Sequence, residues 1–81
     1  MAKRTFNVVV DGQDILIEVE WGRLSNAGEI RVNGKPVKGW GSGMSVPREV
    51  EFEIGNQKAS LVRRGLFIEN WSLIVGGKKL D

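Results

Sequence analysis

Two pairs of glutamates are the side chains whose spacing in this sequence comes closest to acid–base chemistry. Glu18 and Glu20 form one pair, and Glu51 and Glu53 form the other. On a β-strand, residues i and i+2 lie on one face about 6 to 7 Å apart, close to the carboxylate separation in glycosidases. Each pair alternates with apolar residues, however, which places it on the polar, solvated face of a half-buried strand. We therefore expect these glutamates to be surface charges rather than catalytic groups.

The residue types that most catalytic and metal sites require are missing. The 81 residues include no cysteine and no histidine, which removes thiol nucleophiles, the usual zinc ligands and the side chain that most often transfers protons near neutral pH. Gly39, Gly41 and Gly43 lack the Gly-Lys-Ser/Thr sequence that completes a phosphate-binding loop. The sequence predicts no enzyme, no metal and no cofactor.

Length and charge favour one small domain. Apolar residues make up 41% of the sequence, enough for a single small core. The 12 Lys and Arg residues are spread among 10 Asp and Glu residues, so a net charge of +2 is only weak evidence for an anionic partner. No apolar run is long enough for a membrane span, and the N-terminal residues do not resemble a secretion signal. We expect one domain over residues 1–81, located in the cytoplasm.

The stretch over residues 50–61 is typical of a complete β-hairpin with a two-residue Gly-Asn turn at 55–56. Such a turn gives the hairpin one apolar and one polar face, through the pairs Val50 with Leu61, Phe52 with Ala59, Ile54 with Gln57, Glu51 with Ser60 and Glu53 with Lys58. This pairing predicts that Phe52 is buried and that the polar side chains on the opposite face are exposed.

Other dipeptides that accept the positive φ angles of tight turns predict three further hairpins. Asp11-Gly12 joins strands at 6–10 and 15–21, with Phe6 opposite Ile17 and Val8 opposite Ile15. Asn33-Gly34 joins strands at 29–32 and 35–37, with Ile30 opposite Val37. Gly76-Gly77 follows a strand at 66–75 and places Leu73 opposite Leu80. No window of ten residues shows a helical apolar stripe. The class is all-β: an antiparallel β-sandwich of about eight short strands built from hairpins, with a small barrel as the related possibility.

The hairpin faces also predict which side chains form the core. We expect six apolar residues to be buried, Ile17, Val19, Ile30, Phe52, Leu61 and Leu73, and three charged residues to be exposed, Glu51, Glu53 and Lys58. A candidate internal repeat appears at an offset of 43, where Gly12 matches Gly55 and Gly34 matches Gly77. The same offset places inward residues of the first hairpin on outward glutamates, so the sequence leaves a duplication open.

The segment from Lys38 to Pro47 is predicted to be a loop, because it contains three glycines, two serines and a proline. Its large apolar side chains are Trp40 and Met44. In one interpretation, Trp40 folds back over an open end of the sandwich and removes apolar surface from water. In the other, Trp40 and Met44 stay partly exposed as contacts for a protein partner, since both residue types are enriched in interfaces.

Three motifs occur in the order seen in Fas apoptotic inhibitory molecule proteins: VNGKPV at 32–37, FEIGNQKASL at 52–61 and SLIVGGKKL at 72–80. Over roughly residues 17–80 the chain resembles one domain of that family, most like its C-terminal domain. The resemblance implies an antiparallel β-sandwich without recognised catalysis that binds proteins. In animals, members of the family regulate death-receptor survival signalling and guard against protein aggregation. Animal members carry two such domains, and the loop around Trp40 matches no family motif.

The alternative function is single-stranded nucleic-acid binding by a small barrel. Four cations expected near related strand ends would contact phosphates, namely Arg63, Arg64, Lys78 and Lys79, and aromatic residues would stack on bases. Against this, Trp21 and Trp71 fall on apolar faces and are expected in the core, and the sequence has no tyrosine. We therefore prefer a non-catalytic domain that interacts with a protein partner. The sequence specifies neither the identity of that partner nor the oligomeric state of the protein.

Overall fold

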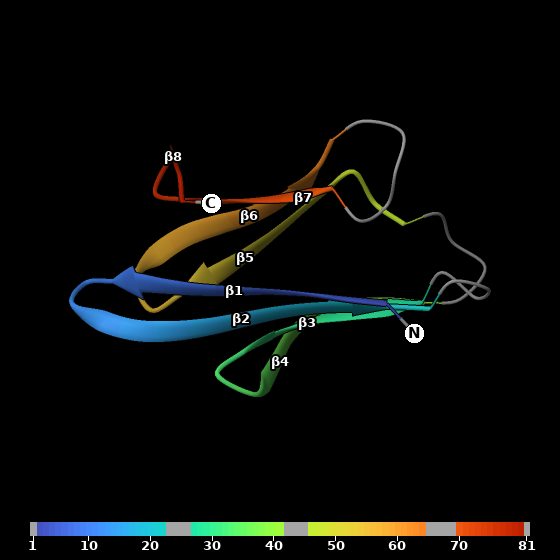
Figure 1. Cartoon of the computed structure of the whole chain (residues 1–81), viewed down its shortest axis with the longest axis horizontal. Coiled ribbons are helices and arrows are strands. Elements are labelled where there is room, and N and C mark those ends of the chain that lie inside the picture. Colours follow the sequence, from blue (N-terminus) through green and yellow to red (C-terminus); the bar gives the residue numbers. More distant parts are fainter. Residues whose placement is uncertain (1, 23–26, 42–45, 65–69, 81) are drawn as a thin grey trace. The chain divides into compact units, whose positions relative to one another are not determined.

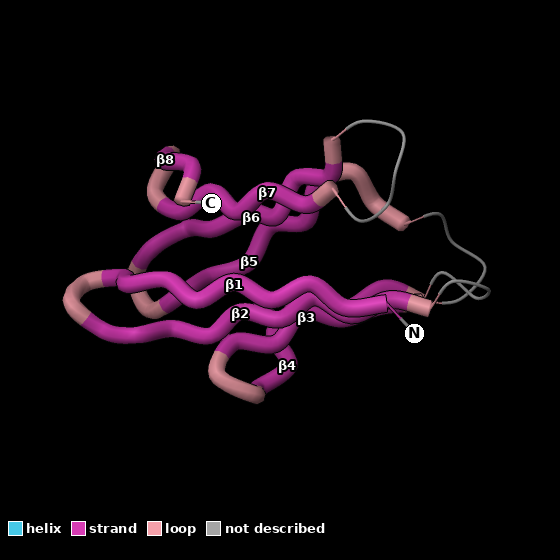
Figure 2. Tube along the Cα trace, in the orientation of Figure 1, coloured by secondary structure: helices cyan, strands magenta, loops and turns pink. Residues whose placement is uncertain are grey.

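The computed structural model describes residues 2–22, 27–41, 46–64 and 70–80, and these residues form strands and turns (Figures 1 and 2). The described strands are β1 (Ala2–Val10), β2 (Gln13–Trp21), β3 (Gly28–Val32), β4 (Lys35–Trp40), β5 (Glu49–Ile54), β6 (Gln57–Arg63), β7 (Trp71–Val75) and β8 (Lys78–Lys79). Every strand pairing is antiparallel. The all-β antiparallel class with about eight short strands is confirmed. Within the described ranges, no helix has the length and apolar character to cross a membrane.

The strands form two four-stranded sheets, in the orders β1-β2-β3-β4 and β5-β6-β7-β8. Two antiparallel sheets of four strands each are the number expected for a small β-sandwich. The chain, expected as one domain over residues 1–81, divides into two compact units, Met1–Val46 and Pro47–Asp81, with one sheet each. Both sheets connect neighbouring strands in chain order (Figure 1). The two halves therefore share one strand plan, as the candidate repeat requires.

Tight turns set the register of the hairpins. Asp11 and Gly12 have φ angles of 51° and 77°, as a type I′ turn requires. The resulting register pairs Phe6 with Ile17 and Val8 with Ile15, as predicted. The predicted pairs of the 50–61 hairpin are also confirmed, and the Leu80 N–H donates to the Leu73 carbonyl oxygen at 2.9 Å.

Each sheet buries one face, and the predicted core residues lie on those faces. In the first sheet Ile17, Val19 and Ile30 are buried, and in the second sheet Phe52, Leu61 and Leu73 are buried. Glu51, Glu53 and Lys58 are exposed on the second sheet, as predicted. Trp21 and Trp71 are also buried, which confirms their expected place in the core.

The expected pairing of Ile30 with Val37 is wrong. The register between β3 and β4 shifts at Ile30/Arg31, so that Arg31 pairs with Pro36 and Ile30 pairs with Lys38. Val37 is the extra residue of this β-bulge, and 40% of its surface is exposed. Proline has no N–H to donate to a ladder and is confined within sheets mainly to edge strands and bulges. Pro36 therefore explains why the irregularity occurs at this point of β4.

The predicted loop at 38–47 also begins too early. Strand β4 continues to Trp40, because Gly39 and Trp40 keep pairing with β3 beyond the bulge. Ladder hydrogen bonds use only backbone groups, so a glycine weakens a strand without ending it. Met44 lies outside the described residues. Of the strand expected at 66–75, β7 covers Trp71–Val75. Asn70 is described but lies outside any strand, which corrects the prediction at that residue, and residues 65–69 lie outside the described ranges.

Candidate functional site

Trp40 lies at the end of edge strand β4, with its indole ring against the backbone of Gly28 on β3. The two residues are cross-strand partners. A Cβ atom placed on Gly28 would overlap Cζ2 of the indole and lie 2.6 Å from its Cε2. Contacts this short do not occur between real atoms, so the ring occupies the space where any other side chain would begin. Trp40 is consequently half-buried and fixed on the sheet.

The bulge at Val37 creates this contact. Without an extra residue in β4, continued pairing from Arg31 and Pro36 would place Gly39 opposite Gly28. With the bulge, the register moves by one residue and Trp40 takes that place. A β-bulge thus re-aims a large side chain at the sheet edge, which is a common use of bulges near functional sites.

An open hollow of about 310 Å³ lies beside the indole. Its lining residues are Trp40, Glu20, Glu29, Ala27 and Gly28. The volume is at the lower limit of small-molecule sites. It is sufficient for one or two side chains of another protein. We call these five residues the Trp40 hollow.

The side chains of Glu20 and Glu29 belong to an ion-pair network around Arg31 on β3. Arg31 Nη1 donates to Glu29 Oε2 at 2.7 Å and to Glu20 Oε1 at 3.3 Å. Its Nε lies 3.6 Å from Glu18 Oε1, and Lys3 Nζ lies 2.6 Å from Glu18 Oε2. Glu20 and Glu29 stand directly opposite each other on β2 and β3, a like-charge arrangement that is unfavourable by itself. Arg31 bridges the two and offsets their repulsion.

The network favours the charged forms of Glu18 and Arg31. The hydrogen bond from Lys3 is the main cause that lowers the pKa of Glu18, and the charge of Arg31 adds to it. Hydrogen bonds to Glu29 and then to Glu20 raise the pKa of Arg31. A general acid needs a raised carboxyl pKa at neutral pH, so a Glu18 that stays ionised is unsuited to that role. Among the described residues, no group of three or more possible ligands is arranged to hold a metal ion.

The second glutamate pair belongs to a different sheet from the first pair. Glu51 and Glu53 lie on β5, opposite Ser60 and Lys58, and are exposed. They belong to the second sheet, whereas Glu18 and Glu20 belong to the first. The second glutamate pair is therefore part of a solvated face, as expected.

The four cations considered for nucleic-acid binding are not gathered at one place. Arg63 pairs with Trp71 at the start of β7, whereas Lys78 pairs with Val75 at its end. Strand residues rise by about 3.3 Å each, so these positions are about 13 Å apart along the sheet. The remaining two cations, Arg64 and Lys79, follow Arg63 and Lys78 directly in the chain. The expectation of related strand ends is wrong: the cations lie at opposite ends of β7.

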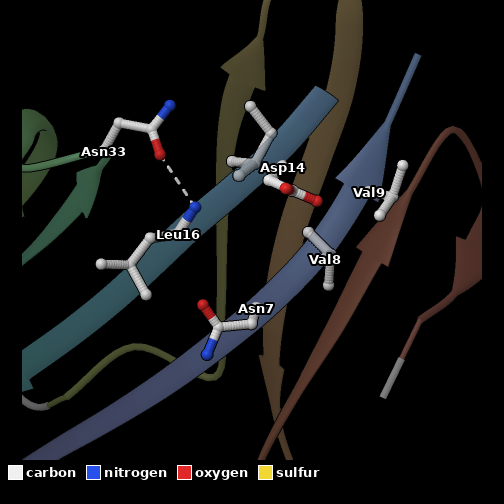
Figure 3. A pocket seen from close by; sticks show the side chains of 7 residues that line it. Asn7, Val8, Val9, Asp14, Leu16 and Asn33 are labelled. Atoms are coloured by element: carbon white, nitrogen blue, oxygen red, sulfur yellow. Dashed lines mark hydrogen bonds between the residues drawn. The ribbon is translucent and has the colours of Figure 1, made fainter. Parts of the chain in front are cut away.

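A second hollow of about 310 Å³ lies near the first hairpin, lined by Asn7, Val8, Val9, Asp14, Ile15, Leu16 and Asn33 (Figure 3). Asn33 Oδ1 accepts a hydrogen bond from the Leu16 N–H at 2.9 Å, and the Asn33 N–H donates to the Leu16 carbonyl oxygen at 2.7 Å. The asparagine side chain thus replaces a backbone carbonyl and extends the β2–β3 ladder by one pair into the turn.

Sequence reasoning missed Arg31 and Gly28. The signal for Arg31 was its cross-strand position opposite Glu18, but that position depends on the β2–β3 register, and no tight-turn dipeptide lies between these strands to set it. No protein-family model and no curated protein matches the sequence. The function is accordingly argued from the site.

Proposed function

We propose that this protein is a non-catalytic interaction domain that binds a protein partner at the Trp40 hollow. The observation that carries the proposal is the half-buried indole held over Gly28 beside an open hollow at an edge strand. Tryptophan is the residue type most enriched among interface residues that dominate binding energy. A ring already fixed in place loses little conformational freedom on binding, which favours affinity.

The state of the glutamates supports a non-catalytic role. Glu18 is paired with Lys3 and Arg31, which hold its pKa below the ordinary value, so it is not poised to exchange protons with a substrate. The network lies on the face of the first sheet opposite to that of the indole, because side chains alternate along β2 and β3.

The resemblance to Fas apoptotic inhibitory molecule proteins supports the same class of function. Its motifs coincide with the β3–β4 turn and first residues of β4, the β5–β6 hairpin and the β7–β8 hairpin. We extend the proposal to a domain of that type, acting in the cytoplasm by binding proteins. Regulation of apoptosis or protection against aggregation are the roles of the animal relatives that this binding would serve.

The test is affinity capture from the native host with wild type, Trp40→Ala and Lys58→Ala. Lys58 is exposed on the second sheet, so Lys58→Ala is the matched surface control. We expect wild type and control to retain the same specific partner and Trp40→Ala to lose it. Turnover on a broad hydrolase panel without any specific partner would overturn the proposal. So would tight, steeply salt-dependent binding of a single-stranded oligonucleotide, the behaviour of a phosphate-driven binder.

A further inference from the structure

The two edges of the first sheet differ in how they are protected against pairing with another chain. Edge strand β4 carries Pro36, the bulge at Val37 and the exposed lysines Lys35 and Lys38, all of which discourage strand addition. Edge strand β1 pairs with β2 over nine consecutive residues without a register shift and contains no proline. Of the two edges, β1 is therefore the one open to another strand.

The turn at 11–12 determines which backbone groups of β1 face outward. The pair that closes a two-residue hairpin, here Val10 with Gln13, exchanges both of its hydrogen bonds. Every second residue from Val10 back to Ala2 then bonds to β2. The alternate residues direct their N–H and C=O groups away from β2, and these are Lys3, Thr5, Asn7 and Val9.

The cations on β1 do not block this edge. Lys3 extends over one face of the sheet to Glu18, with Nζ 2.6 Å from Oε2. Arg4 extends over the other face, where its guanidinium carbon lies 4.6 Å from the centroid of the Phe6 ring. Both charged groups are thus held along the faces of the sheet. Val9 is a large apolar residue of β1 that remains in solvent, with 65% of its surface exposed.

We infer that two copies of this chain pair antiparallel through β1, with Phe6 of one copy opposite Phe6 of the other. This register overlaps all nine residues from Ala2 to Val10 and matches outward-facing groups with outward-facing groups, Lys3 with Val9 and Thr5 with Asn7. The inference does not rest on the proposed function, because the Trp40 hollow contains no residue of β1.

The distribution of charge along β1 favours the same register, because it keeps like charges apart. Lys3 and Arg4 occupy one end of β1 and three valines occupy the other. Antiparallel pairing therefore places each cation opposite a valine of the second copy. The two Lys3 positions are six residues apart along the paired strands, about 20 Å, which exceeds the Debye length at physiological salt of about 8 Å. The aliphatic stem of Lys3 can cover the exposed Val9 of the second copy.

The test is sedimentation velocity over a concentration series on the full chain, with two opposite variants of Val9. For wild type we expect a mass that rises from 9.0 kDa towards twice that value. Position 9 lies opposite Lys3 of the second copy, and this pair occurs twice in the symmetric dimer. Val9→Glu should therefore tighten dimerisation about tenfold, whereas Val9→Lys should weaken it by a similar factor. Because Val9 is exposed, neither change disturbs the core.

A third variant, Thr5→Pro, removes an outward N–H without removing a bond to β2, and should abolish the dimer while circular dichroism shows retained strands. Three results would overturn the inference: a mass of 9.0 kDa at every concentration, Val9 variants that shift the equilibrium in the same direction, or a folded Thr5→Pro variant that still dimerises. If Thr5→Pro does not fold, the direction of the shifts in the two Val9 variants still decides whether the inference holds.

Discussion

The indole ring of Trp40 lies directly on the backbone of Gly28, its cross-strand partner, at a distance that leaves no room for a Cβ atom. This relationship couples two features that are unremarkable alone, a glycine in a strand and a tryptophan at a strand end. It explains why a strand tolerates glycine here, since the space that a side chain would fill is occupied by the aromatic ring. The contact also holds the ring beside the Trp40 hollow.

Gly28→Ala should therefore destabilise the protein by about 1 to 3 kcal/mol, the usual cost of overpacking. Urea titration measures the loss. In a Trp40→Ala background the same substitution should cost less, because the overlap of the new Cβ with the indole ring disappears. Part of the cost should remain, since the new Cβ would still lie 2.7 Å from the Glu20 carbonyl oxygen. Equal costs in both backgrounds would contradict the packing described.

Asn33 should contribute through both its backbone conformation and its side chain. It has a φ angle of 51°, and its Oδ1 accepts the Leu16 N–H. Asn33→Gly keeps the backbone conformation and loses the acceptor, so it should cost about 1 kcal/mol. Asn33→Ala should cost about 1 kcal/mol more, because alanine is disfavoured in the left-handed region. Asn33→Asp, which keeps the acceptor, is the control, and an Asn33→Gly variant as stable as wild type would refute a role for the bond.

Stability should depend on pH through Glu18. Its pKa is lowered in the folded protein, mainly by the hydrogen bond from Lys3, from an ordinary value of 4.5. The unfolded chain therefore binds a proton at higher pH than the folded chain, so the stabilisation is complete above about pH 5 and is lost as pH falls through the lowered folded pKa. Unfolding free energies measured between about pH 6 and pH 3 should fall less steeply for Glu18→Gln. Lys3→Met should have the same effect, and unchanged slopes in both variants would contradict it.

The second sheet should respond to substitution according to its faces. Phe52 is buried, and Phe52→Ala should cost about 3 to 5 kcal/mol. Lys58 is exposed opposite Glu53, and Lys58→Ala should cost at most about 1 kcal/mol. Urea midpoints of the two variants provide the comparison. Similar losses would mean that the two faces of the hairpin contribute alike, contrary to their burial.

Turn chemistry explains how much of the fold was predictable. The dipeptides at 11–12, 55–56 and 76–77 set the pairing of their hairpins, and alternation of apolar residues then identified the buried faces. The turn at 33–34 was equally clear, yet the pairing of Ile30 was wrong, because a bulge adds a residue beyond the turn without a local signal of comparable strength. Pro36 was a weaker local signal, because proline within a strand is typical of edge strands and bulges.

The candidate site was less predictable than the fold. Trp40 was identified as a large apolar residue among glycines, but its contact with Gly28 depends on the one-residue shift at the bulge. Arg31 bridges glutamates across the β2–β3 pairing, whose register has no tight turn to define it. Interactions between strands joined by longer connections are thus decided by sheet packing rather than by local residue patterns.

The most direct test of the central claim combines partner capture and stability for Trp40→Ala. Because Trp40 is half-buried at a strand end, its removal should cost less than the about 3 to 5 kcal/mol of a fully buried aromatic residue, and the variant should remain folded by its urea midpoint. Partner affinity should fall by about thirtyfold or more, the loss typical of an interface hot spot of about 2 kcal/mol. A folded Trp40→Ala variant that captures its partner as well as wild type would contradict the account.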